Sequence, residues 1–302
     1  MSDNIRFMRK DVTSVPEVRS PTVRRRELGA LLRSLRMKKS LTVEQAAKQL
    51  MFSMSKLSRM ETGQGVPTAR DLRDLWALYG VTDGAERDRM TKLATEGKEL
   101  GWWDSRELNS TFGTYGTYVG LEEAATELLY YQSAIVPGLL QTAGYARAIH
   151  EARIPKPAEE LIDERVDVRM TRQRRLTQAP LLSISVVMDE AALHRVVGGL
   201  AVMRAQLARL VEIARMPNVT LQVIPFLAGA HPAMDCTFRI LKFASSMPDV
   251  VYVEALSGGF FVERPELKSV YSETFEHVCA SALDLEESIR LIERVGRGYA
   301  AE

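Results

Sequence analysis

The chain has 302 residues, of which 46% are hydrophobic and 26% are charged, and its formal net charge is +1. This composition is typical of a folded protein long enough for two domains, and it excludes a fibre or a disordered tail. No apolar run approaches the ~20 residues of a membrane helix, and the polar N-terminus lacks the apolar core of a signal peptide. We therefore expect a cytoplasmic protein that makes no contact with the membrane.

Positive charge is concentrated near the N-terminus. Residues 20–63 contain ten Lys and Arg residues against three acids, a net charge of about +7, whereas residues 121–302 carry about −5. A basic patch on a folded module is typical of phosphate binding, which weakens steeply as the salt concentration rises. For the run of arginines at residues 24–26, solvation of a helix surface is an equally good interpretation.

Residues 1–20 lack helical or strand periodicity and are predicted to form a flexible N-terminal arm. A helix follows over residues 23–37, because its apolar residues share one side. These inward residues are Leu28, Leu31, Leu32 and Leu35. The first folded domain is therefore expected to begin near residue 21.

Residues 41–63 have the spacing of two short helices that meet at a tight turn, a shape that reads DNA. Thr42 is predicted to cap the first helix and Ser53 the second. Ala46 and Ala47 lie on the buried side of the first helix, and their small size allows the second helix to cross at close range.

The second helix of the pair is predicted to bury Leu57 and Met60, which lie three positions apart. The remaining side chains are then left on its outer side. These are Met54, Ser55, Lys56, Ser58 and Arg59. Such a mixture of polar, cationic and apolar groups suits contact with phosphates and base edges.

The region at residues 23–81 resembles the helix-turn-helix domain of the Xre/Cro/lambda-repressor-like family. The resemblance depends most on Ala47, Ser53 and the Glu-Thr-Gly sequence at residues 61–63. In that family an arginine at the end of the first helix pairs with the glutamate that closes the recognition helix. The resemblance therefore implies that Arg36 and Glu61 form a pair that locks the recognition helix in place.

Two positions depart from the family pattern. Met51 stands where glycine is common, at a turn position that favours a left-handed backbone, and we expect this to cost about 1 kcal/mol. Val43 stands where many relatives carry a glutamine that forms a hydrogen bond with a DNA phosphate. The valine side chain has no group that forms this hydrogen bond.

The resemblance implies binding to double-stranded DNA as a homodimer, with half-sites about one helical turn apart. Met54 and Ser55 are expected to face bases, and Arg59 to bind a guanine through its planar guanidinium. Phosphate contacts are expected from Thr42, Lys56 and Ser58. The complete predicted DNA-binding set is Thr42, Ser53, Met54, Ser55, Lys56, Ser58 and Arg59. For Lys56 and Arg59, ordinary solvated charge is the alternative interpretation.

A fourth helix is predicted to begin after Pro67, with Thr68 as its cap, and to end at Gly80. A fifth, over residues 85–100, leads out of the first domain. The next segment, residues 101–119, is rich in aromatic residues, glycine and hydroxyl side chains, which suits a connection that packs on a second domain.

Trp102 and Trp103 lie in this connection. They are candidates for lining a ligand pocket, although adjacent tryptophans at the start of a domain more often fill a core or an interface.

Beyond residue 120, helices and strands are mixed. Helices are predicted over residues 121–135, 142–152, 159–178, 190–197, 202–215, 265–280 and 285–295. Strands are predicted over residues 181–189, 219–225, 236–243 and 250–255. The expected fold is mainly α with an α+β C-terminal domain: a five-helix domain at residues 21–100 followed by a larger helical/β sensor domain at residues 101–302.

The second region also resembles a known module, the C-terminal domain of WhiJ-type bacterial regulators. The resemblance is carried by VPGLLQT at residues 136–142, RQRRL at 172–176, MDEAALHRVVGG at 188–199, and VIPF followed by GAHPAMD. Such regulators are similar to antitoxins encoded beside a small acidic protein. The resemblance implies that the second domain senses such a partner. Cys236 stands where glycine is usual in that family.

Candidate sites for metal binding or catalysis are weak. Glu190 with His194 and His231 with Asp235 are each four residues apart, but no third ligand has a recognisable spacing, so no metal or cofactor is expected. The stretch at residues 256–261 has two glycines but lacks the Lys-Ser/Thr of a phosphate loop, and no Gly-x-Ser-x-Gly elbow is present. We expect no enzyme.

The two cysteines, Cys236 and Cys279, are far apart in the sequence, and we expect them to be reduced thiols. No Cys-x-x-Cys motif is present, which excludes a zinc finger.

The sequence therefore predicts a sequence-specific transcription regulator whose second domain senses a partner. Three alternatives remain open. One is an antitoxin-like interaction protein that binds DNA only to regulate its own synthesis. Another is a small-molecule-sensing repressor with residues 101–119 near a pocket. The third is an enzyme in the second domain, for which the sequence shows no recognisable set of catalytic residues.

Overall fold

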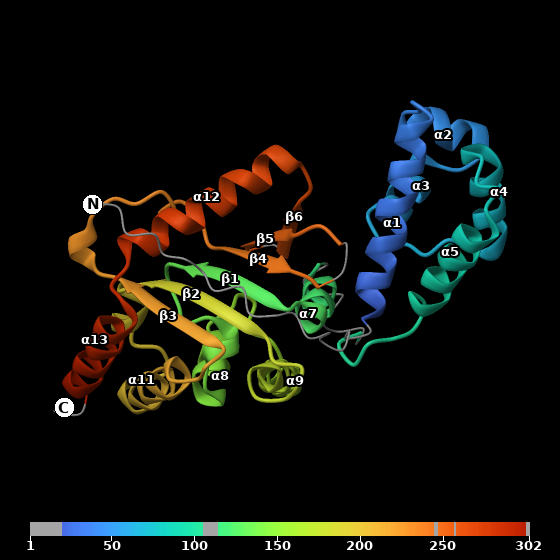
Figure 1. The fold of residues 1–302 in the computed structure, drawn as a ribbon. Helices are drawn as coiled ribbons and strands as arrows, with labels where there is room; N and C mark the ends of the chain where they lie inside the picture. The colour runs from blue at the N-terminus through green and yellow to red at the C-terminus, as the bar shows by residue number, and fades with distance from the viewer. Residues whose placement is uncertain (1–19, 105–113, 245–246, 257, 300–302) are drawn as a thin grey trace, which may run out of the picture.

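The computed structural model describes residues 20–104, 114–244, 247–256 and 258–299. These residues form an all-helical first domain and a larger second domain built on a six-stranded sheet (Figure 1). The predicted fold class is confirmed. The predicted arm lies outside the described residues, except for Ser20.

The first domain consists of α1 (Pro21–Lys38), α2 (Val43–Leu50), α3 (Met54–Glu61), α4 (Ala69–Tyr79) and α5 (Gly84–Glu96). The sequence supplies a start signal for each helix: a proline in the first turn of α1 and a capping side chain for the other four. Gly80 ends α4 with a left-handed φ of 71°, as predicted.

The apolar sides of these helices meet in one core. Each helix contributes a fully buried side chain: Leu32, Ala46, Leu57, Leu75 and Met90. Helices of this length are barely stable alone in water, so burial of these apolar side chains supplies most of the free energy that holds the domain together.

The sheet of the second domain has the strand order β3-β2-β1-β4-β5-β6. Its strands are β1 (Glu127–Gln132), β2 (Ser183–Asp189), β3 (Val219–Ile224), β4 (Phe238–Lys242), β5 (Val250–Ala255) and β6 (Gly258–Val262). β1, β2 and β3 pair in parallel, whereas β1 with β4, β4 with β5 and β5 with β6 are antiparallel. The sheet is therefore mixed, with β1 at its centre.

Helices cover both faces of this sheet. They are α7 (Tyr115–Ala124), α8 (Ala143–Glu151), α9 (Glu159–Arg172), α10 (Ala191–His194), α11 (Leu200–Ala214), α12 (Pro265–Ser281) and α13 (Leu285–Gly298). Figure 1 shows α8, α9 and α11 on one face and α12 on the other. Burial on both faces explains why β2 reads as a continuous apolar run, with Val186 packing on one side and Val187 on the other.

The helix predicted over residues 121–135 is wrong. α7 ends at Ala124, and the chain then enters β1, which pairs with β2 along one edge and β4 along the other. The neighbouring tyrosines Tyr130 and Tyr131 are both buried, in separate clusters on opposite faces of the sheet. Pairing with two distant strands therefore overrides the local helical preference of this segment.

β6, which pairs antiparallel with β5 in a hairpin, was not predicted from the sequence. One of the two glycines of residues 256–261 allows close packing there. A Cβ atom at Gly259 would lie 2.1 Å from the hydroxyl oxygen of Tyr252, so only glycine allows this approach.

The N-terminal end of α1 belongs to both domains. Val23 is buried in the core of the second domain together with Trp103, and the Ser20 hydroxyl donates a 2.6 Å hydrogen bond to the carbonyl oxygen of Gly120. One turn later, the Arg26 guanidinium carbon lies 4.2 Å from the centre of the Phe261 ring. α1 therefore makes contacts in both domains.

Candidate nucleic-acid interface and a charged cavity in the second domain

The turn between α2 and α3 has the predicted caps. The Thr42 hydroxyl accepts the Gln45 amide at 3.1 Å, and the Ser53 hydroxyl accepts the Lys56 amide at 3.1 Å. Met51 ends α2 with a left-handed φ of 54° and a side chain that is 92% exposed. A non-glycine residue therefore occupies the strained position, as the sequence predicts.

α3 buries Leu57 and Met60 and presents its other side to solvent. All five residues predicted for the outer side are exposed: Met54, Ser55, Lys56, Ser58 and Arg59. Within the described residues, the Arg59 side chain has no ion pair or hydrogen bond, so its guanidinium is available to a ligand. The helix has the exposed polar edge that contact with a DNA groove requires.

Lys56 is more constrained than the sequence suggests. Its Nζ lies 2.6 Å from Asp71 Oδ1 and 3.9 Å from the centre of the Phe52 ring. Burial favours a higher pKa for Asp71, but hydrogen bonds from Lys56 and Thr68 outweigh it and lower the pKa. A phosphate contact by Lys56, which stays a prediction, would have to share this ammonium group with Asp71.

The end of α3 is fixed to α1 by the predicted ion pair. Arg36 Nε and Nη2 donate to the two carboxylate oxygens of Glu61 at 2.7 and 2.8 Å, and Nη1 donates to the Leu41 carbonyl at 2.7 Å. Arg36 is 8% exposed and Glu61 9%. The hydrogen bond to Glu61 raises the pKa of Arg36. Beside this pair, a Cβ at Gly29 would lie 2.6 Å from the carbonyl oxygen of Met60, so the two helix backbones touch.

The two tryptophans have different surroundings. Trp103 is 2% exposed and fills the core, whereas Trp102 is 44% exposed and lines a surface hollow with Glu123 and Arg174. Neither side chain lines the arginine-rich cavity that lies between the sheet and helices α7, α8 and α9.

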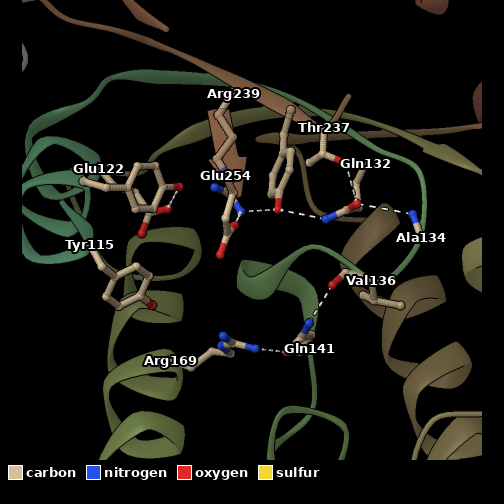
Figure 2. A network of polar contacts seen from close by, with 12 residues as sticks. Tyr115, Glu122, Gln132, Ala134, Val136, Gln141, Arg169, Thr237, Arg239 and Glu254 are labelled. Atoms are coloured by element: carbon tan, nitrogen blue, oxygen red, sulfur yellow. Dashed lines mark hydrogen bonds and ion pairs between the residues drawn. The ribbon is translucent and has the colours of Figure 1, made fainter. Parts of the chain in front are cut away.

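The charged cavity lies between the sheet and helices α7, α8 and α9. It holds about 800 Å³ of empty space, including its open mouth, and a smaller cavity beside it shares Arg153, Arg169 and Glu254. Figure 2 shows Arg169 and Gln141 on one side of the open space and Arg239 and Glu254 on the other. Residues from four separate parts of the chain therefore form one polar site.

Two arginines of the cavity are held by carboxylates. Arg172 donates to both oxygens of Glu122 at 2.6 and 2.8 Å, and Arg239 Nη2 lies 2.6 Å from Glu254 Oε2. The Arg239 charge lowers the pKa of Glu254. The Arg239 guanidinium also lies 4.3 Å from the Tyr130 ring centre, and both contacts fix its orientation.

Sequence reasoning did not assign this cavity. Gln141 and Arg172 occur in the motifs quoted above, but without a role. A usable signal is present in the strands themselves, because Arg239 and Glu254 are charged residues beside the apolar residues of β4 and β5. Charged residues are rarely placed there unless they are paired or serve a site.

The histidine pairs considered from the sequence form separate contacts. His194 Nε2 lies 3.2 Å from Glu190 Oε1, whereas His231 Nε2 lies 3.8 Å from Asp189 rather than pairing with Asp235. Among the described residues, no cluster of three or more His, Cys, Asp or Glu side chains could hold a metal ion. Both cysteines are free thiols.

Comparisons with known proteins identify both parts of the chain. A family model described as a helix-turn-helix domain matches residues 27–90, and one described as a domain of unknown function (DUF5753) matches residues 115–294. Searches among curated proteins and among solved structures found no match. No helix in the described segments is long and apolar enough to cross a bilayer. The first match supports an Xre-like regulator that binds DNA, while the likeness to WhiJ-type regulators stays a prediction.

Proposed function

Because the chain belongs to the DUF5753 family and carries a helix-turn-helix domain ahead of that module, we propose a cytoplasmic, sequence-specific transcription regulator. It binds double-stranded DNA as a homodimer through α3, and the DUF5753 domain controls this binding in response to an effector. The chain acts by binding rather than by catalysis. The exposed outer side of α3, locked from behind by Arg36 and Glu61, is the observation that carries the proposal.

Arg59 tests the proposed DNA contact. Replacing Arg59 by alanine is expected to weaken binding by about 1 to 3 kcal/mol and to relax the preference at one base pair per half-site. Binding is measured by fluorescence anisotropy on operator fragments selected from genomic DNA and on random DNA. Arg89→Ala, which removes an exposed arginine from α5, is the matched control and should leave the preference intact. Equal losses on specific and random DNA would assign Arg59 to the phosphate backbone instead.

Contacts of Arg26 support a physical link between the domains. A Cβ at Gly63, just after α3, would lie 2.7 Å from the Arg26 side chain, so Arg26 touches the end of the recognition helix. On its other side, Arg26 contacts Phe261 of β6 and lies 3.4 Å from Glu263. A movement of the β5–β6 hairpin would therefore be transmitted to α3 through the Arg26 side chain.

The effector proposed first is a small acidic protein encoded nearby, on the basis of the WhiJ-type resemblance. Co-purification of such a protein with the chain, followed by release of bound DNA when it is added, is the expected result. Co-purification without release of DNA would favour the antitoxin-like alternative, in which DNA binding serves only autoregulation.

A small-molecule effector is the second candidate, and the charged cavity favours it. Tyr115 and Tyr118, from the aromatic-rich segment at residues 101–119, line this cavity. Ligand-dependent changes in thermal stability and in DNA affinity would distinguish a small-molecule effector from a protein effector.

A further inference from the structure

In the described residues, no carboxylate lies within ion-pair distance of Arg169 of α9, although the charge of Glu254 acts on it from further away. One of its terminal nitrogens donates to the amide oxygen of Gln141, and its Nε is buried without a hydrogen-bond partner among the described residues. Burial lowers the pKa of Arg169. A buried cation is unfavourable unless an anion pairs with it, so this guanidinium favours an anionic ligand.

Arginines are the most frequent charged residues around Arg169. The described lining of the two adjoining cavities includes five arginines, at positions 153, 165, 169, 172 and 239, and Glu254 is its one carboxylate. Glu254 is already within ion-pair distance of Arg239, and the nearby Glu122 is paired with Arg172. The charge of Arg169 therefore favours an anion in the space beside it.

His150 provides an independent observation that points to a ligand. The residue is 4% exposed, it lines the smaller cavity, and neither ring nitrogen has a hydrogen-bond partner in the described part of the chain. Burial and the charges of Arg169, Arg153 and Arg165 lower its pKa to about 3. The imidazole is therefore neutral at pH 7 and offers one N–H donor to a ligand.

Aromatic rings form much of the remaining wall. Tyr115, Tyr118 and Tyr130 line the larger cavity, and Tyr118 stacks on Tyr252 with ring centres 4.6 Å apart. Such walls suit the planar, apolar body of a small organic molecule, while the arginine fork suits a carboxylate or phosphate group.

We propose that this cavity binds a small organic acid. Its carboxylate or phosphate accepts hydrogen bonds from the Arg169 guanidinium, and its apolar body lies against Tyr115 and Tyr130. This proposal specifies the chemical class of the small-molecule effector. It rests on that proposed function only for the effect of the ligand on DNA binding. That link has a structural basis, because Glu254, Gly258 and Gly259 of the cavity lie in the same hairpin that contacts Arg26 through Phe261.

Isothermal titration calorimetry of the full chain tests the site without DNA. The probes are benzoate, phenyl phosphate, inorganic phosphate and neutral benzamide. We expect saturable binding of benzoate or phenyl phosphate at one site per chain, with benzamide at least about tenfold weaker because it lacks the charge. The stronger of the two acids identifies the anionic group.

Variants assign the binding to Arg169. Arg169→Gln should weaken the acid at least about tenfold, whereas Arg174→Gln, at an exposed arginine just after α9, should leave the affinity unchanged. Thermal melting confirms that both variants are folded, and Arg169→Lys should restore part of the affinity.

Several results would overturn the proposal. They are the absence of saturable binding by both aromatic acids, equal binding of benzamide, unchanged affinity in a folded Arg169→Gln variant, or binding of inorganic phosphate alone. The effect of the acid on DNA affinity is measured separately, by fluorescence anisotropy. Acid binding with no effect on DNA affinity would therefore reject the link to regulation while leaving the site in place.

Discussion

The ion pair between Arg36 and Glu61 allows the most direct test of how the recognition helix is held. Replacing Glu61 by methionine keeps the helix propensity and side-chain length but leaves the Arg36 guanidinium buried, at 8% exposure, without its counter-ion. Breaking a buried pair in this way costs about 3 to 5 kcal/mol. Because Arg36 still donates to the Leu41 carbonyl, we expect a loss at the lower end, about 3 kcal/mol.

Hydrogen exchange, resolved by peptide mass spectrometry, measures this loss where it occurs. The opening free energy of amides in α1 and α3 should fall by about 3 kcal/mol in Glu61→Met and in Arg36→Met. The double variant removes both charges and should recover to within about 1 kcal/mol of the original protein, since a well-packed apolar pair replaces an ion pair at little cost.

A surface pair gives the control for this cycle. Arg73 and Asp74 lie 3.8 Å apart with side chains 72% and 39% exposed, and Arg73→Met should change stability by no more than about 0.5 kcal/mol. If each single variant of the buried pair lost less than about 1 kcal/mol, and the double variant lost their sum, the two charges would not depend on each other. Such additivity would contradict a coupled ion pair that holds α3 against α1.

Three further predictions concern single positions. Met51→Gly relieves a left-handed residue whose side chain is 92% exposed, so we expect the urea midpoint to rise by the equivalent of about 1 kcal/mol; an unchanged midpoint would contradict strain there. Gly29→Ala places a Cβ 2.6 Å from two backbone oxygens at the end of α3, so thermal melting should show a loss of about 1 to 3 kcal/mol, and a neutral result would contradict the close crossing. His150 has a folded pKa of about 3 against an ordinary value of 6.5, so the unfolded chain binds its proton first as pH falls. Stability should drop by about 2 kcal/mol more between pH 7 and pH 5 than in His150→Gln, as measured by urea unfolding, and equal slopes would contradict a neutral buried histidine.

The helix-turn-helix domain could be predicted from the sequence because its signals are local. Thr42 and Ser53 each cap a backbone amide only three residues away, and Leu57 with Met60 repeats within one helical turn. The Arg36–Glu61 pair joins residues 25 positions apart, and it was reached only through the family resemblance.

The second domain was predicted less completely. Its flanking helices and four of its strands follow from apolar periodicity, but β1 was read as part of a helix. The segment Glu127–Gln132 is a strand because β2 and β4, about 55 and 110 positions later in the chain, satisfy its backbone hydrogen bonds. The pattern of apolar residues within a short stretch of sequence carries no information about distant partner strands.

The amino-acid order alone decided where most helices start and stop, which residues of α3 face outward and that a second, mixed domain follows. Folding in three dimensions decided the charged cavity, because Arg169, Arg239 and Glu254 become neighbours only when α9, β4 and β5 pack together. The physical reason is distance along the chain. Caps and helical stripes act between residues three or four apart, whereas burial, charge pairing and the shape of a site depend on which distant segments meet.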